Sequence, residues 1–175
     1  MRLVAILCVL AATVLGFPDK LIRCKVCDRA MHHVWMKAVE LRHKCRHHYT
    51  ESGHPDERCD YSNVHPWAVN QMVWGVCDAL PVTYQAVLKD EDFRIIATEG
   101  DPAHTEEAAR AIKESCVRWL HTVHTAESVG NTVLGNLEVG KTTEVILKSL
   151  KKRFCQKACQ DHPTHEFSHE DRDEL

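Results

Sequence analysis

Three groups of residues in this chain have types and spacings that can carry chemistry. The first is CKVC, Cys24 to Cys27, a C-x-x-C pattern whose thiols are activated in many disulfide oxidoreductases. The second is GNLEVGKT, Gly135 to Thr142, which fits G-x-x-x-x-G-K-[ST], the loop that binds nucleotide phosphates in many NTPases. The third is an excess of histidine, with 13 in 175 residues. Whether any of these groups works as a site depends on the elements around it.

The phosphate-loop pattern lacks the elements that it needs. A working loop joins a buried strand to the start of a helix, so that backbone N–H groups and the helix dipole face the phosphates. The preceding residues, AESVGNTVL, predict no strand, and no βαβ pattern follows. We therefore expect no nucleotide. Gly130, Gly135 and Gly140 instead predict a bend that leads into a last helix starting near Thr142.

The cysteines favour a structural role. Cys8 lies in an apolar N-terminal run, and eight cysteines remain: Cys24, Cys27, Cys45, Cys59, Cys77, Cys116, Cys155 and Cys159. An even number in an oxidising compartment predicts four disulfides. CKVC has no thioredoxin-like βαβ setting, and a second pair near the end of the chain offers partners for both of its sulfurs. We expect no catalytic residues, with a thiol oxidoreductase as the less favoured alternative.

Apolar periodicity predicts the helices that carry these cysteines. One stripe alternates spacings of three and four without Gly or Pro: Cys24, Cys27, Met31, Val34, Ala38, Leu41 and Cys45. Further stripes run over residues 69–87, with a kink or restart at Pro81, and over 109–123 and 139–159. Residues 93–98 have strand-like types and precede a Gly-Asp-Pro turn. The fold predicted is an all-α bundle with one short extended segment near residues 93–98.

Helix packing narrows the disulfide pairing. The first and last helices each carry two cysteines about one turn apart, so antiparallel packing brings the outer two together and the inner two together. Another two lie on the interior stripes of the middle helices, and the last two flank a polar loop. Count alone allows 105 pairings. The pairs expected are Cys24–Cys159, Cys27–Cys155, Cys77–Cys116 and Cys45–Cys59.

Both ends of the chain carry targeting patterns. Arg2 precedes an apolar run that ends at Leu15, short for a bilayer span, with small residues placed for cleavage before Phe17. The last four residues, Arg172, Asp173, Glu174 and Leu175, resemble the K-D-E-L class of retrieval signal. Together they predict the endoplasmic reticulum (ER) lumen, with a retrieval receptor as a partner. We divide the chain into a signal peptide at 1–16, a domain at 17–159 and an acidic, His-rich tail at 160–175.

Charge is mild in sum and uneven in distribution. The net charge of −3 is too small to indicate nucleic acid as a partner. Basic residues gather on the first and last helices, and stapling these helices together would form one basic face: Lys25, Arg29, Lys37, Lys148, Lys151 and Lys152. Such a face could bind acidic client segments or anionic lipid headgroups. Ordinary solvated helix faces agree equally well with the sequence.

The histidines predict no tight metal site. His43 and His47 are spaced i,i+4, and His48 and His54 lie close in sequence. A helical i,i+4 pair can chelate Zn²⁺ or Cu²⁺, but a tight site needs three or four converging ligands. No carboxylate is placed clearly on the same face. We expect a solvated polar segment over residues 43–65 and no metal or cofactor, and a response of this segment to pH stays open.

The cysteine frame resembles a known family. C-x-x-C near the start, two cysteines in the middle helices and C-x-x-x-C at the end form a saposin-like arrangement. The contexts VCDAL and SCVRWL, the FRII stretch and the RDEL tail are similar to the Canopy family of ER-resident saposin-like proteins. The pair Cys45/Cys59 and the His-rich residues 42–66 depart from that pattern. The resemblance implies a non-enzymatic accessory that helps receptors or secreted clients fold or leave the ER. Saposin-type lipid binding is the alternative.

Overall fold

A computed structural model describes residues 19–51, 56–89, 92–97, 106–122, 126–138 and 142–160. The proposed signal peptide and retrieval tail lie outside these residues. The described helices are α2 (Asp19–Glu51), α3 (Pro66–Thr83), α4 (Glu106–Thr122), α5 (Ala126–Glu138) and α6 (Thr143–Cys159). The described strands form two antiparallel hairpins, β1 (Cys59–Asp60) with β2 (Asn63–Val64) and β3 (Tyr84–Lys89) with β4 (Asp92–Ala97).

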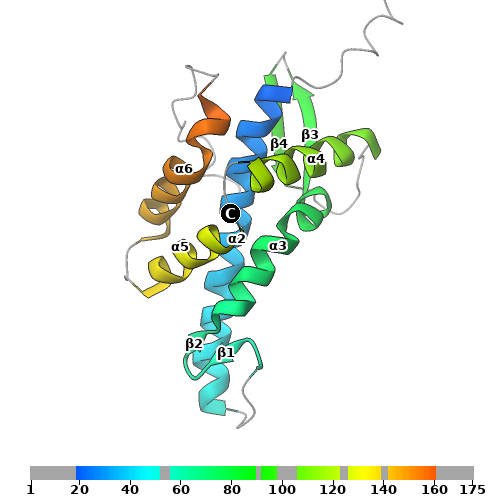
Figure 1. Cartoon of the computed structure of the whole chain (residues 1–175). Helices are drawn as coiled ribbons and strands as arrows, with labels where there is room; N and C mark the ends of the chain where they lie inside the picture. Colours follow the sequence, from blue (N-terminus) through cyan, green and yellow to red (C-terminus); the bar gives the residue numbers. More distant parts are fainter. Residues whose placement is uncertain are drawn as a thin grey trace, which may run out of the picture.

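Helix α2 is the axis about which the other elements pack (Figure 1). Its 33 residues extend about 50 Å at 1.5 Å per residue. The whole stripe expected from Cys24 to Cys45 is buried. In Figure 1, α6 lies to the left of α2 and α3 to its right, α5 packs mainly against α3, and the hairpins lie near the two ends of α2. A single long helix therefore supplies one wall of the core to nearly every other element.

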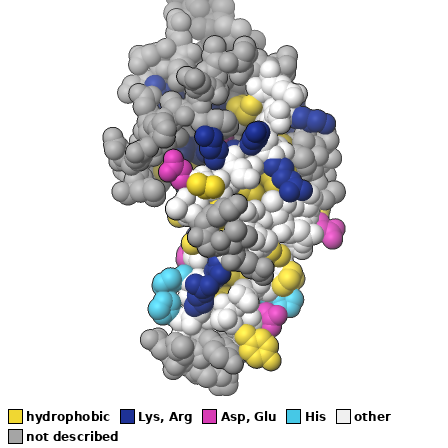
Figure 2. Space-filling view, turned by 90° about the vertical axis from the view of Figure 1, so that its left-hand side faces the viewer, with side chains coloured by type: hydrophobic (Ala, Val, Ile, Leu, Met, Phe, Trp, Pro, Cys, Tyr) yellow, Lys and Arg dark blue, Asp and Glu magenta, His cyan; other side chains and the backbone are white. Residues whose placement is uncertain are grey.

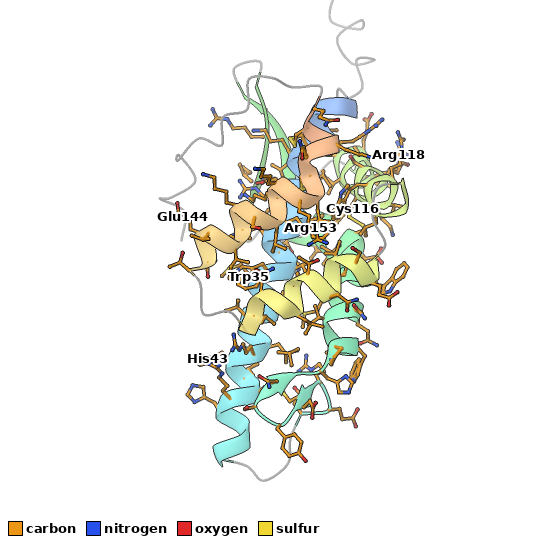
Figure 3. All side chains as sticks on the ribbon, turned by 60° about the vertical axis from the view of Figure 1, so that its left-hand side comes forward. Trp35, His43, Cys116, Arg118, Glu144 and Arg153 are labelled. Carbon is orange, nitrogen blue, oxygen red and sulfur yellow. A yellow bond between two sulfur atoms is a disulfide. The ribbon has the colours of Figure 1, made fainter. Side chains whose placement is uncertain are left out.

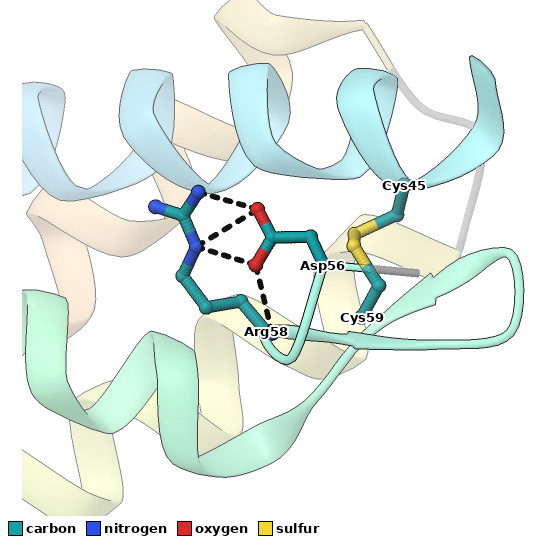
Figure 4. The surroundings of a disulfide bond; sticks show 4 residues. All are labelled: Cys45, Asp56, Arg58 and Cys59. Carbon is teal, nitrogen blue, oxygen red and sulfur yellow. Dashed lines mark hydrogen bonds and ion pairs between the residues drawn. A yellow bond between two sulfur atoms is a disulfide. The ribbon is translucent and has the colours of Figure 1, made fainter. Parts of the chain in front are cut away.

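Four disulfides hold this arrangement, in the pairing that helix packing predicts: Cys24–Cys159, Cys27–Cys155, Cys77–Cys116 and Cys45–Cys59. Two of them join α2 to α6, one joins α3 to α4, and one ties the C-terminal part of α2 to β1 (Figure 4). The Cα–Cα distances lie between 4.7 and 5.7 Å, within the range that a disulfide spans. The prediction of a disulfide-stapled, saposin-like helical fold is confirmed.

The second helix ends earlier than its apolar spacing predicts. Helix α3 continues past Pro81 only to Thr83, and Tyr84 is already extended, with φ −131° and ψ 147°. Proline lacks the N–H that would bond back into the helix, and β-branched Val82 and Thr83 favour strand. The extended segment near 93–98 is consequently one strand of a hairpin, paired with residues expected to be helical. Tyr84 continues the apolar stripe of the helix and is also buried as a strand residue, so its spacing alone did not distinguish the two.

Helix α5 was missed because its glycines predicted a bend. Gly130 and Gly135 both lie inside the helix, and the break before α6 falls at residues 139–141, outside the described chain. The apolar residues at positions 126, 129, 133 and 137 are buried and follow helical spacing. Gly130 is buried where α5 meets α3, and a Cβ there would overlap the Asn70 side-chain oxygen. Gly135 is exposed, with nothing within 4 Å of a Cβ at that position.

The two glycines predict opposite effects of the same substitution. Gly130→Ala should lower the free energy of unfolding by about 1–3 kcal/mol, since the methyl group forces the Asn70 side chain to move within the packed contact between α5 and α3. Gly135→Ala should raise it by about 0.5–1 kcal/mol, because alanine loses less backbone entropy in a helix. Urea unfolding of both variants measures this. Adding Asn70→Ala should restore part of the loss from Gly130→Ala, and equal effects at the two positions would contradict the close approach.

The paired bridges between α2 and α6 should stabilise the fold non-additively. Their sequence separations are 135 and 128, so with one bridge closed the other closes a ring of only about seven residues. In the chain-entropy model the first closure contributes about 5 kcal/mol and the second about 2–3 kcal/mol. Replacing either cysteine pair by alanine should cost about 2–3 kcal/mol, and replacing both about 7 kcal/mol. Denaturant unfolding measures each variant, and additive losses would contradict the redundancy.

Candidate binding surfaces

Two of the six basic residues expected on a shared face hold the fold together. Lys151 Nζ lies 2.7 Å from the Asp28 carboxylate, and the lysine side chain is only 18% exposed. Arg29 Nε donates a hydrogen bond to the Ile95 carbonyl at 3.1 Å, and its guanidinium lies 5.7 Å from the centre of the Tyr84 ring. These side chains fasten α6 and the β3–β4 hairpin to α2. A partner could engage them only by breaking those contacts.

Lys37 belongs to a separate ion-pair cluster on α2. Its Nζ lies 3.1 Å from the Glu40 carboxylate, and Lys44 Nζ lies 2.7 Å from the same group. Hydrogen bonds from Lys44 and Lys37 lower the pKa of Glu40 to about 2, so the carboxylate is charged at neutral pH. All three side chains are about half exposed, and solvent screens their attraction. The charge of Lys37 is therefore partly neutralised by Glu40.

Two of the six residues expected on the basic face are exposed side chains of α6. Lys148 and Lys152 are exposed one turn apart, and Lys25 on α2 is half-buried. Two further exposed residues of α6, Arg153 and Lys157, were not in the face expected from the sequence. We call Lys148, Lys152, Arg153 and Lys157 the α6 basic surface. Figure 2 shows the side of the molecule where α6 lies, with Lys and Arg side chains interspersed among hydrophobic ones over its upper half.

An open polar groove adjoins this surface between α5 and α6. It has a volume of about 590 Å³ and is lined by Glu127, Ser128, Asn131, Thr132, Gly135, Asn136 and Arg153. Arg153 lies between the two helices in Figure 3. Thr132 and Asn136 direct hydrogen bonds to carbonyls of their own helix, each at 2.8 Å. The groove lacks the apolar lining typical of small-molecule sites and acts here as a polar border of the α6 basic surface.

The phosphate-loop pattern lies between two helices. Gly135 to Glu138 form the last turn of α5, and Thr142 is the N-cap residue of α6. The element before the pattern is thus a helix, where a phosphate loop requires a strand. Residues 139–141, including the lysine, lie outside the described chain. The bend expected from the glycines is therefore wrong at Gly130 and Gly135, which lie inside α5, and Gly140 lies outside the described residues.

The C-x-x-C cysteines are not bonded to each other. Cys24 and Cys27 each join a cysteine of α6, and Cys27 is completely buried. A reactive cysteine needs an accessible thiolate. Neither sulfur is a thiol in this state, and the Cys27–Cys155 bond is shielded from solvent. The pair functions here as two structural bonds between helices.

Helix α3 carries an exposed aromatic stripe that the sequence did not point to. Trp74 is 63% exposed, Trp67 37% and Val82 78%. With the exposed Gln71 and Asp78 they recur at helical spacing along one face, and we call these five residues the α3 tryptophan stripe. Asp78, which lies between Trp74 and Val82 on the stripe, forms an ion pair of 2.6 Å with Lys113 of α4. The signal in the sequence was that both tryptophans fall off the core stripe of their helix.

Two histidines lie in the packed part of α2. Burial lowers the pKa of His32 below its ordinary value, and the charges of Lys151 and Arg29 lower it further, against a smaller opposing effect of Asp28. Burial also lowers the pKa of His33, with a contribution from Lys37. The His33 ring meets the Tyr84 ring edge-on, with 6.4 Å between centroids. Both histidines are therefore held neutral near pH 7 beside the contacts that join α2 to α6 and to β3.

In the described part of the chain, no group of three or more His, Cys, Asp or Glu side chains could hold a metal ion. No helix of those residues is both long and apolar enough to cross a membrane.

The lowered pKa values predict that acid weakens the fold. Unfolded histidine binds a proton near pH 6.5, whereas His32 and His33 in the folded state bind it only at lower pH. The free energy of unfolding therefore keeps its full value above pH 6.5, where both states hold neutral histidines. It decreases as pH falls below 6.5, because the unfolded state then binds protons more readily than the folded state. Thermal unfolding between pH 7.5 and 5 should show a shallower decline for His32→Gln than for the wild type. His43→Gln, at an exposed position of the same helix, is the control, and identical slopes in all three proteins would contradict this assignment.

The chain matches no protein-family model, no curated protein and no solved structure. Its function is therefore inferred from the sequence patterns at its two ends, its disulfide frame and the two surfaces described above.

Proposed function

We propose that this protein is a non-enzymatic accessory protein of the ER lumen that binds client proteins or receptor ectodomains and assists their folding or export. The apolar N-terminal run and the RDEL tail support the location, since a chain needs entry to the ER before it can use a retrieval receptor. Its four disulfides suit an oxidising compartment. The resemblance to the Canopy family supports an accessory role.

The observation that carries this proposal is the α3 tryptophan stripe. Tryptophan is among the residues that contribute most to protein–protein binding, and large apolar side chains exposed in a row mark interaction surfaces. Trp74 and Val82 leave well over half of their surface in solvent. The helix beneath them is bonded to α4 through Cys77–Cys116, so the stripe is presented without a large ordering cost on binding. An unfolded client with exposed apolar segments is the partner that fits it.

A saposin-type lipid-binding protein is the second candidate. Tryptophan side chains favour the interface between water and hydrocarbon, and basic clusters favour anionic headgroups. The α3 tryptophan stripe and the α6 basic surface provide both kinds of group. The retrieval tail favours the client-binding role, because a lysosomal lipid activator has no use for return to the ER.

Trp74→Ser should weaken client binding by about thirtyfold or more, the loss expected when a hot-spot side chain worth at least 2 kcal/mol is removed. The probe is a reduced, carboxymethylated secretory protein titrated against the purified oxidised protein. Gln71→Ala, on the same stripe, should change the affinity little and is the matched control. Both exposed variants should keep the wild-type unfolding temperature.

The second candidate has its own arm of the experiment. Lys148→Glu/Lys152→Glu should leave binding of the unfolded probe almost unchanged while removing any binding to vesicles that contain phosphatidylserine. Strong vesicle binding by the wild type, lost in this variant, together with no binding of the unfolded probe would overturn the client-binding proposal in favour of lipid binding. Unchanged probe affinity in Trp74→Ser would show that the stripe is not the client surface.

A further inference from the structure

His43 and His47 form a close pair on the outer face of α2. Their Nε2 atoms are 3.1 Å apart, and their ring centroids are 4.2 Å apart. Both residues are exposed, and Figure 3 shows His43 pointing away from the bundle. A hydrogen bond between two ring nitrogens requires one donor and one acceptor, so this contact is made when at least one ring is neutral. The two Nε2 atoms thus lie close together at the surface.

The distance between the two nitrogens fits a shared metal ion. Imidazole nitrogens lie about 2.0–2.1 Å from Zn²⁺ and at similar distances from other late first-row ions. Two nitrogens 3.1 Å apart at that bond length subtend an angle of about 98° at the ion, between the square-planar and tetrahedral values. The ion would take the place of the shared proton, and the donor ring would carry its proton on Nδ1 instead. A rotation of the exposed rings about their side-chain bonds would then turn both Nε2 lone pairs toward the ion.

The fold fixes the part of α2 that carries the pair. Cys45 lies midway between the two histidines, on the opposite face of the helix, where it is buried and bonded to Cys59 of β1 (Figure 4). The bridge closes only 14 residues and ties the helix to the β1–β2 hairpin. The backbone that sets the spacing of His43 and His47 is therefore anchored on its inner side. A preorganised pair loses less entropy on binding than a pair on a free helix end.

The charges around the pair decide which ions it can hold. Arg42, Lys44 and Arg46 are its neighbours in sequence, and Glu40, about one turn before His43, is engaged by Lys44 and Lys37. This basic setting opposes ions such as Ca²⁺ and Mg²⁺, which are held by charge and by oxygen ligands. Cu²⁺ bonds more strongly to imidazole nitrogen than any other divalent ion of its row, followed by Ni²⁺ and Zn²⁺. The bond to nitrogen, rather than attraction of charges, must supply the affinity.

We propose that His43 and His47 form a two-nitrogen chelate for late first-row divalent ions, with Cu²⁺ bound most tightly. The site supplies two ligands and leaves the other coordination positions to water or to a ligand from a second molecule. It is thus an exchangeable site at the surface, distinct from the α3 tryptophan stripe and independent of the proposed function.

Titration of Cu²⁺ into the purified oxidised protein tests this proposal. His43→Gln and His47→Gln should each weaken the affinity for the first equivalent of Cu²⁺ by about 100-fold, the lower end of what linking two ligands gains. The electron paramagnetic resonance spectrum of the first equivalent should show nitrogen coupling from two imidazoles in the wild type. Zn²⁺ should bind the same pair more weakly, and Ca²⁺ should show no binding there.

His48→Gln is the matched control, because position 48 lies about 100° around the helix from position 47. It should keep the wild-type Cu²⁺ affinity, and near-ultraviolet circular dichroism should be the same for all the variants. Copper held by histidines elsewhere would persist equally in every variant. Unchanged affinity in folded His47→Gln, or an equal loss in His48→Gln, would overturn the two-histidine assignment.

Discussion

The bond pair between α2 and α6 is the constraint on which the rest of the structure depends. Cys24–Cys159 and Cys27–Cys155 lie about one helical turn apart and join the same two helices. A single bridge would leave α6 free to rotate about it, whereas two fix both the register and the direction of the helix. The Lys151–Asp28 ion pair and the hydrogen bond of 3.1 Å from Trp119 Nε1 to the Phe154 carbonyl then position α6 against α2 and α4. The orientation of the α6 basic surface follows from this fixed register.

The disulfide pairing was predictable because the spacing of cysteines in a helix shows which face they lie on, and bonded cysteines require the two helices to pack with those faces together. The stripe from Cys24 to Cys45 is regular enough that antiparallel packing left one natural arrangement of the end pairs. The strand at Tyr84 and the helix around Gly130 were harder. Tyr84 fits the apolar stripe of a helix and is buried as a strand residue, and a glycine in the sequence does not show whether it makes a bend or admits a neighbouring helix. Only the position of Asn70 decides that second question.

The sequence predicted that basic residues gather on α2 and α6, but only partly which of their side chains are accessible. Charge and helix phase placed Arg29 and Lys151 near the right surface, but they cannot show that a carbonyl or a carboxylate already occupies the side chain. The α3 tryptophan stripe was overlooked for the converse reason. A tryptophan in an apolar segment is usually counted with the core, and its exposure depends on which helices pack nearby. The surfaces available to a partner are therefore those that the packing of the helices leaves exposed.

The long separation within the paired bridges also has a consequence for biosynthesis. In the ER lumen proposed for this protein, Cys24 and Cys27 would enter early, while their partners are synthesised 135 and 128 residues later. During that interval the two thiols are close enough in sequence to be oxidised to each other. These two native bonds cannot form until α6 has been translocated, whereas Cys45–Cys59 of the same helix spans only 14 residues. On that proposal, maturation of this chain would include a period of waiting or of disulfide reshuffling, with the chain itself a substrate of an oxidoreductase.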